Sequence, residues 1–123
     1  MNTKETYKVV STNFDESIEL TFDLVVDIPE AYFHEFNKFW TGAGDRLMQA
    51  NHDIKQVFCE LYAAQLLHGY IYDTVCNDLT ANSYIERQEG FYPSSEVSIK
   101  NFYCDFDAST KTKYKTVETQ DEQ

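Results

Sequence analysis

Carboxylate side chains recur at β-strand spacing in two segments of this 123-residue sequence, 16–27 and 96–107. Alternate residues of a strand point to the same face and lie about 6.7 Å apart, since a strand rises about 3.3–3.4 Å per residue. Rows of carboxylates at this spacing are similar in charge to a phosphate backbone, and they attract the Lys and Arg side chains of a basic surface. Five acids are therefore candidate partner-binding residues: Glu19, Asp23, Asp27, Asp105 and Asp107.

The charge of the chain favours the same interpretation. The formal net charge is −11, and residues 14–107 alone hold 17 acidic and five basic residues, a net charge of −12. Such a body repels nucleic acid and anionic membranes, and the three lysines of "KTKYK", residues 111–115, do not outweigh it. We expect a basic protein as partner, with no direct nucleic-acid or membrane partner. An ordinary solvated sheet face, kept soluble by its charge, is the alternative explanation.

The stretch "TGAG", residues 41–44, has the composition of a phosphate-binding loop. Such a loop follows a strand, precedes a helix and uses a Lys, Ser or Thr to reach the phosphates. Here the glycines follow a helical pattern, and no G-K-[ST] sequence is present. We predict instead that Gly42-Ala43-Gly44 ends one helix and lets the chain turn into the next.

The three histidines, His34, His52 and His68, do not have the spacing of a metal site. None has a second His or Cys three or four residues further on, as zinc sites on helices do. His68 lies within an apolar stripe, which is typical of a hydrogen-bonded core histidine. We expect no metal and no cofactor.

The three cysteines, Cys59, Cys76 and Cys104, are odd in number and lack a C-x-x-C spacing, so we predict reduced thiols rather than a disulfide framework. Cys59 and Cys76 are predicted in the core, and Cys104 is predicted to point inward. No G-x-S-x-G sequence is present. We therefore expect no enzyme activity and no catalytic residue. A deep polar pocket holding a histidine beside carboxylates would favour the alternative, a small enzyme or ligand-binding domain.

Two strands are predicted at the N-terminus. Residues 4–12 read as a strand, and residues 16–27 alternate, with "NFDE", residues 13–16, as a hairpin turn. The apolar face of the second strand is predicted to be Ile18, Leu20, Phe22 and Leu24.

The middle of the chain is predicted to be helical. The first helix covers 29–40, with Asn37 on its outer side and an apolar face of Tyr32, Phe33, Phe36, Phe39 and Trp40. A helical turn over 45–50 follows. Asp53 then caps the longest helix, whose predicted apolar stripe is Ile54, Val57, Phe58, Leu61, Ala64, His68, Ile71 and Val75. Leu66, Leu67 and Tyr70 widen this apolar arc, which predicts a central helix covered on more than one side. A short helical piece is expected near 83–88.

The last predicted strand, 96–107, contains a conflict of parity. Val97 and Ile99 share one face, whereas Phe102, Cys104 and Phe106 share the other. A strand in one register cannot bury both sets, so we predict a bulge or tight turn at Lys100-Asn101.

The order of elements predicts an α+β fold, a small antiparallel sheet of about three to four strands with two to three helices packed on one face. Residues 1–107 are expected to form a single domain. Residues 108–123 form a polar tail rich in Lys and Thr, either disordered or an edge strand with protective lysines.

Two stretches carry a resemblance to a known family: "EFNKFWTGAGDRLMQANHDI", residues 35–54, and "EGFYPSSEVSIKNFYCDFD", residues 89–107. They resemble a family of short acidic proteins encoded by bacteriophages and prophages and catalogued as a domain of unknown function. The likeness covers roughly residues 7–107. The chain departs from it at Phe91-Tyr92, where the family has a Trp before the proline, and in its Lys-Thr tail. The resemblance implies an origin in a phage or mobile element and no known enzymatic activity.

Together these features predict a non-enzymatic phage accessory protein that binds a host protein with a basic, nucleic-acid-binding surface. An inhibitor of a host defence such as CRISPR or restriction, acting as a nucleic-acid mimic, is the most concrete version. A self-associating structural or scaffold protein is the alternative, and both monomer and homodimer stay open. No apolar segment reaches the roughly 18 residues that span a bilayer, so we expect the host bacterial cytosol as its location.

Overall fold

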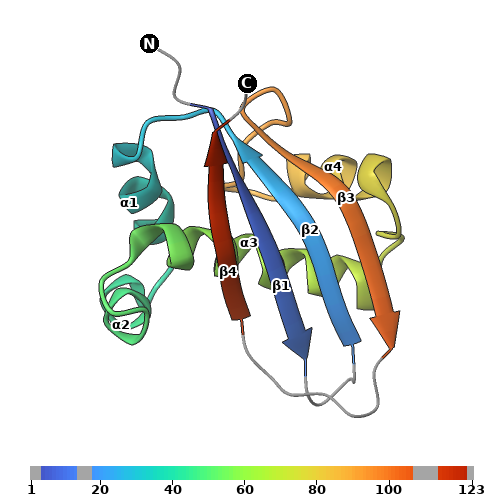
Figure 1. Ribbon diagram of the computed structural model, residues 1–123, viewed down its shortest axis with the longest axis horizontal. Helices are drawn as coiled ribbons and strands as arrows, with labels where there is room; N and C mark the ends of the chain where they lie inside the picture. The colour runs from blue at the N-terminus through green and yellow to red at the C-terminus, as the bar shows by residue number, and fades with distance from the viewer. Residues whose placement is uncertain (1–3, 14–17, 107–113, 122–123) are drawn as a thin grey trace.

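The computed structural model describes residues 4–13, 18–106 and 114–121 (Figure 1). Its elements run in the order strand, strand, four helices, strand, strand. The strands are β1 (Glu5–Asn13), β2 (Ile18–Val26), β3 (Val97–Phe106) and β4 (Tyr114–Asp121). The helices are α1 (Ala31–Lys38), α2 (Ala43–Gln49), α3 (Ile54–Tyr72) and α4 (Asp78–Glu86).

The four strands form one antiparallel sheet in the order β3-β2-β1-β4. In Figure 1 the long helix α3 runs behind the strands, and no helix of the described chain crosses the near face. This confirms the predicted α+β class, an antiparallel sheet with helices on one face. Residues 114–121, which lie in the segment expected to be either disordered or an edge strand, form β4 beside β1. Among the described residues, no helix has the length and apolarity needed to span a membrane.

The alternation predicted for β2 is confirmed. Ile18, Leu20, Phe22 and Leu24 are all buried on the helix side, whereas Glu19, Thr21 and Asp23 are partly exposed on the other side. β1 and β2 pair directly from Glu5 with Val26 to Asn13 with Ile18. The connection between them, where a hairpin turn was predicted, lies outside the described residues.

The predicted irregularity in the last strand is also present. Thr21 pairs with Tyr103 and Asp23 pairs with Lys100, so two residues of β3, Asn101 and Phe102, lie opposite the single residue Phe22. Asn101 has a φ of 55°, the left-handed conformation typical of the first residue of such a bulge. The extra residue exchanges the faces of the strand, and Val97, Ile99 and Phe102 are all buried as a result.

Helix α4 covers part of the free edge of β3, and side chains make the connection. The Asp78 carboxylate accepts hydrogen bonds from the backbone N–H groups of Asn101 and Phe102 at 3.0 and 2.7 Å. The Asn82 side chain accepts from the N–H of Ile99 at 2.8 Å and donates to its C=O at 2.9 Å. The helix predicted near 83–88 lies earlier in the chain, at Asp78–Glu86, because the Asn77–Thr80 capping box starts it there.

The core between α1, α3 and the sheet is built largely from aromatic rings. Phe33 stacks on Phe58 with ring centroids 4.4 Å apart, and Phe36 stacks on Tyr62 at 5.4 Å. The predicted apolar face of α1 was partly wrong, because Tyr32 and Phe39 are about half exposed. Only one side of this short helix contacts α3, and five aromatic side chains do not fit on it.

The predicted stripe of α3 is correct for its first turns and wrong for the rest. Ile54, Val57 and Phe58 are buried, but Ala64, His68 and Ile71 are exposed. The second half of the helix buries the arc that was predicted to widen the stripe at Leu66 and Leu67, and its buried residues are Tyr62, Ala63, Leu66, Leu67 and Gly69. Both arcs are rich in apolar residues, so periodicity alone does not decide between them. The helix ends at Tyr72, and Val75 is buried in the connection that follows.

Candidate functional site

The side of the sheet that faces away from the helices is the first candidate site, and we call it the outer sheet face. Its accessible described side chains are Lys8 and Val10 on β1, Glu19, Thr21 and Asp23 on β2, and Ser98, Lys100 and Tyr103 on β3. Tyr103 is 61% exposed, the most accessible aromatic ring on this face. Two acids and two lysines are interleaved here, Glu19 and Asp23 with Lys8 and Lys100, whereas the sequence analysis considered only the carboxylates of this face.

The register brings together two of the five predicted partner-binding residues. Glu19 on β2 is the direct partner of Asp105 on β3. The structure describes the backbone of Asp105 but not its side chain, and Asp107 lies outside the described residues. The acidic end of the outer sheet face is therefore the end at which Glu19 and Asp105 are paired.

Asp23 is engaged by neighbours on both sides. Its carboxylate forms an ion pair with Lys8 of β1 at 3.5 Å and accepts a hydrogen bond from the Asn101 side chain at 2.8 Å. Its direct partner on β3 is Lys100. Asp23 therefore helps to hold the bulge and the β1–β2 pair, and its charge is compensated locally.

Asp27 lies beyond the end of β2, apart from the other candidates. Its backbone N–H donates to the C=O of Glu96 at 2.8 Å. It lines a cavity of about 150 Å³ together with Lys4, Glu96 and Lys100. The predicted residues thus divide into an acidic pair, Glu19 with Asp105, and two carboxylates that lie near lysines.

A second candidate site lies on the helix side of the molecule, where sequence reasoning did not predict one. It is a cavity of about 450 Å³, which we call the aromatic pocket, lined by Trp40, Arg46, Leu61, Ala64, Gln65, His68 and Phe91. Residues from the end of α1, from α2, from α3 and from the connection after α4 meet there. These residues are far apart in sequence, and only the packing of three helices brings them together.

Arg46 belongs both to this pocket and to the end of α1. Its guanidinium donates to the C=O groups of Asn37, Trp40 and Thr41 at 2.8 to 3.1 Å, and to the Asn37 side chain at 2.7 Å. The last carbonyls of a helix have no partner within the helix, and Arg46 supplies one. Gly42, with a φ of 93°, makes the turn that returns the chain over α1. The predicted glycine turn is confirmed at Gly42, but α1 ends earlier, at Lys38, and Ala43 and Gly44 already belong to the first turn of α2.

Asn37 is part of the same arrangement, and its predicted place on the outer side of α1 was wrong. It is almost completely buried, and its amide donates to the C=O of Ala43 at 3.1 Å. Burial of a polar amide requires hydrogen-bond partners, and Arg46 and Ala43 provide them. A sequence signal exists only in retrospect, as a polar residue in the last turn of α1 and an arginine nine residues later.

The opposite side of the aromatic pocket is formed by polar residues of α3. Gln65 Nε2 donates to the Tyr84 hydroxyl at 2.9 Å, and His68 Nδ1 lies 2.9 Å from the same oxygen. The expectation that His68 is a core histidine was wrong, because its side chain is exposed. His68 lines the pocket, but none of the described lining residues is a carboxylate. The pocket therefore lacks the pairing of histidine and carboxylate that would favour an enzyme.

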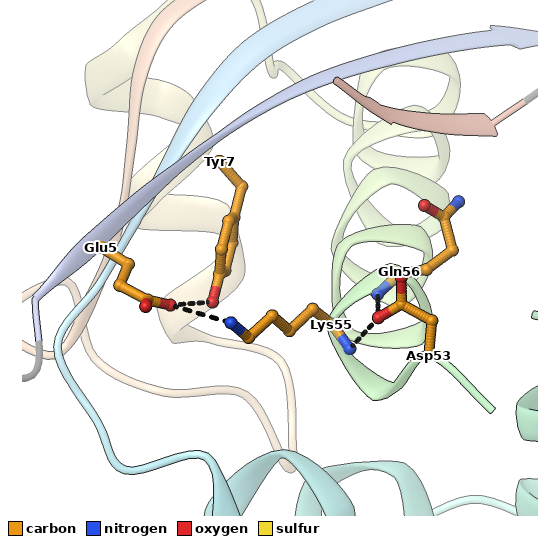
Figure 2. Close-up of polar contacts among 5 residues, drawn as sticks. All are labelled: Glu5, Tyr7, Asp53, Lys55 and Gln56. Atoms are coloured by element: carbon orange, nitrogen blue, oxygen red, sulfur yellow. Dashed lines mark hydrogen bonds and ion pairs between the residues drawn. The ribbon is translucent and has the colours of Figure 1, made fainter. Parts of the chain in front are cut away.

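A third polar cluster joins the start of β1 to the start of α3 (Figure 2). Glu5 accepts a hydrogen bond from the Tyr7 hydroxyl and forms an ion pair with Lys55 at 3.7 Å. Burial and the adjacent Glu5 carboxylate raise the pKa of Tyr7 above its usual range. Asp53 caps α3 beside this cluster, accepting from the N–H groups of Lys55 and Gln56, as predicted. The Glu5 carboxylate contacts both Tyr7 and Lys55, so we interpret the cluster as a structural contact between β1 and α3.

In the described part of the chain, potential metal ligands do not cluster and the cysteines form no disulfide. No three His, Cys, Asp or Glu side chains there come together as ligands for a metal ion. All three cysteines are thiols; Cys59 is buried and Cys104 partly buried. Cys76 is exposed, contrary to the prediction of a core position, because α3 ends before it.

The chain matches no protein-family model, no curated protein and no solved structure. Any functional proposal therefore rests on the geometry and charge of the outer sheet face and the aromatic pocket.

Proposed function

We propose that this chain is a non-enzymatic protein that binds a basic protein through the outer sheet face. One observation carries the proposal: a face without a helix over it, with Tyr103 exposed on it, occurs in a chain of net charge −11. Tyrosine is enriched in protein interfaces, and the polar and charged residues around Tyr103 suit the rim of such an interface.

Electrostatics would act on this binding at two distances. The charge of −12 over residues 14–107 accelerates encounter with a basic partner, and added salt screens it. At contact, Glu19 and its register partner Asp105 lie at the end of the face where acids are adjacent. Glu19 is therefore the acidic residue that we expect to contact a Lys or Arg of the partner.

The most concrete form of the proposal is a phage or mobile-element protein that inhibits a host defence in the bacterial cytosol. Its partner would be a nucleic-acid-processing protein, and the acidic end of the outer sheet face would occupy the channel that binds phosphates. The support for this form is the net charge of the chain and the pairing of Glu19 with Asp105 at one end of the outer sheet face.

Affinity capture from a bacterial lysate tests the proposal. The captured partner is then purified, and its binding to the chain is measured directly. We expect the chain to capture a basic protein at low salt and to lose it at high salt. Glu19→Lys and Tyr103→Ala are each expected to weaken binding about tenfold or more, since each removes a contact worth about 1.4 kcal/mol or more.

Glu89→Lys is the matched control, since it makes the same charge change at an exposed residue outside the outer sheet face. Equal loss of binding in Glu19→Lys and Glu89→Lys would reduce the effect to net charge and contradict the assigned face. Asp23 is left intact, because its bonds to Lys8 and Asn101 maintain the sheet. If the chain alone formed a homodimer, and Tyr103→Ala dissociated it, the self-associating alternative would be favoured instead.

A further inference from the structure

The walls of the aromatic pocket are apolar and partly formed by flat rings. The Trp40 and Phe91 rings meet at an angle of 53° with their centroids 5.2 Å apart. Leu61 and Ala64, one helical turn apart on α3, complete the apolar lining. A volume of about 450 Å³ lies within the range of about 300–1,000 Å³ that is usual for small-molecule sites. The lining therefore suits a ligand that contains one aromatic ring.

The charge in the pocket is positive, although the chain is strongly acidic. Four of the five N–H groups of the Arg46 guanidinium donate, two to Asn37 of α1 and two to the C=O groups of Trp40 and Thr41 after the helix, which leaves one in the contacts with described residues. The ion pairs of Lys8 with Asp23 and of Lys55 with Glu5 do not involve Arg46. With no carboxylate in the described lining, the pocket favours an anion and disfavours a cation.

The orientation of the polar groups is fixed by their other bonds. Arg46 is held by four hydrogen bonds, to Asn37 of α1 and to the two residues Trp40 and Thr41, and Gln65 is held by its bond to Tyr84. The approach of Tyr84 depends on Gly69, where a Cβ atom would lie 2.7 Å from the Tyr84 ring. A site whose polar groups are already held in place loses little conformational entropy when a ligand binds.

We propose that the aromatic pocket binds a small aromatic carboxylate. The ring would lie against Trp40 and Phe91, and the carboxylate would accept from the remaining N–H of Arg46. This site lies on the helix side of the molecule, so its occupancy does not depend on the function proposed for the outer sheet face.

Titration with 3-phenylpropionate tests the proposal, and its neutral counterpart 3-phenylpropanamide is the matched probe. Trp40 is the only tryptophan of the chain and lines the pocket, so its fluorescence reports binding directly. We expect a saturable change, with the acid bound about tenfold more tightly than the amide, since hydrogen bonds to charged groups are the stronger ones. Calorimetry repeats both titrations without reliance on Trp40.

Two exposed alanines on helices provide the matched variants. Ala64→Phe places a ring in the pocket, whereas Ala31→Phe places one at the start of α1, outside the pocket lining. Binding of 3-phenylpropionate is expected to fall at least tenfold in Ala64→Phe and to be unchanged in Ala31→Phe. Absence of saturable binding by either probe would overturn the proposal. Equal binding by Ala64→Phe and the unaltered chain would overturn it too, and equal affinity of the two probes would overturn the role of the charge.

Discussion

Several contacts between the helices depend on single residues that the sequence patterns did not identify as important. Arg46 connects α1 to α2 by donating to the last carbonyls of α1, and buried Asn37 completes that connection. Gly69 is a second such residue, because it lies in α3 at the place where Val75 and Tyr84 come closest. The residue type at both places is explained by the neighbouring groups that it contacts and not by its helix propensity.

Gly69→Ala is predicted to lower the free energy of unfolding by about 1–2 kcal/mol. The new Cβ would lie 2.6 Å from Val75 Cγ2 and 2.7 Å from the Tyr84 ring. Overpacking costs about 1–3 kcal/mol, and the gain in helix propensity of up to about 1 kcal/mol offsets only part of it. Urea denaturation measures the difference.

Gly44→Ala is the control for that prediction. Gly44 lies in α2, and nothing lies within 4 Å of an added Cβ. We expect its free energy of unfolding to be unchanged or raised by less than about 1 kcal/mol. If Gly69→Ala also raised the stability, the close approach of Tyr84 would not be the reason for a glycine at position 69.

At the scale of elements, helix α4 partly covers one edge of the sheet. β3 is an edge strand, and side chains of α4 pair with its backbone at Ile99, Asn101 and Phe102. An unpaired strand edge is a template for association with another chain. The contacts from Asp78 and Asn82 therefore both support the bulge and cover the part of the edge beside it.

Asp78→Ala is predicted to lower the free energy of unfolding by about 1–3 kcal/mol, since two backbone N–H groups lose a charged acceptor. Hydrogen exchange gives the specific readout. In Asp78→Ala the exchange of the Asn101 and Phe102 amides is expected to accelerate more than that of the β2 amides, relative to the unaltered chain. Asp45→Ala removes an acid from the first turn of α2, which packs on α3, and controls for the helix dipole. Equal exchange at Phe102 in the two variants would contradict the role of Asp78.

Sequence patterns predicted those parts of the fold in which one face is apolar and the other polar. The alternation of β2 fixed its buried side, and the parity conflict in β3 fixed the place of the bulge to within a residue. The second half of α3 was not predictable in this way, since apolar residues nearly surround the helix. The aromatic pocket gave no sequence signal, because its lining depends on tertiary packing.

At the scale of the whole molecule, burial links two tyrosines to the pH dependence of stability. Burial raises the pKa of both Tyr7 and Tyr62 above the usual range, although the bond from the Tyr92 N–H to Tyr62 acts in the opposite direction. A group whose pKa is raised by folding contributes stability below its unfolded pKa, near 10 for tyrosine, and loses it as the pH rises above that value.

The free energy of unfolding is therefore predicted to fall above about pH 10, by about 1.4 kcal/mol per pH unit for each buried tyrosine that ionises only in the unfolded chain. In Tyr62→Phe the decline is expected to be shallower, although the lost hydrogen bond costs about 1 kcal/mol at neutral pH. Tyr72→Phe, at a residue that is 75% exposed, is expected to leave the slope unchanged. Denaturation at a series of alkaline pH values measures it, and identical slopes in both variants would exclude a contribution from Tyr62.

The two ends of the described chain meet within the sheet. β1 and β4 are antiparallel neighbours, and Glu5 is the direct register partner of Asp121. Neighbouring termini are the condition under which circular permutation is tolerated. A short linker between these two residues would turn β4 and β1 into a hairpin and close the chain into a ring. The order in which the elements follow one another along the polypeptide is thus only one of several that this sheet accommodates.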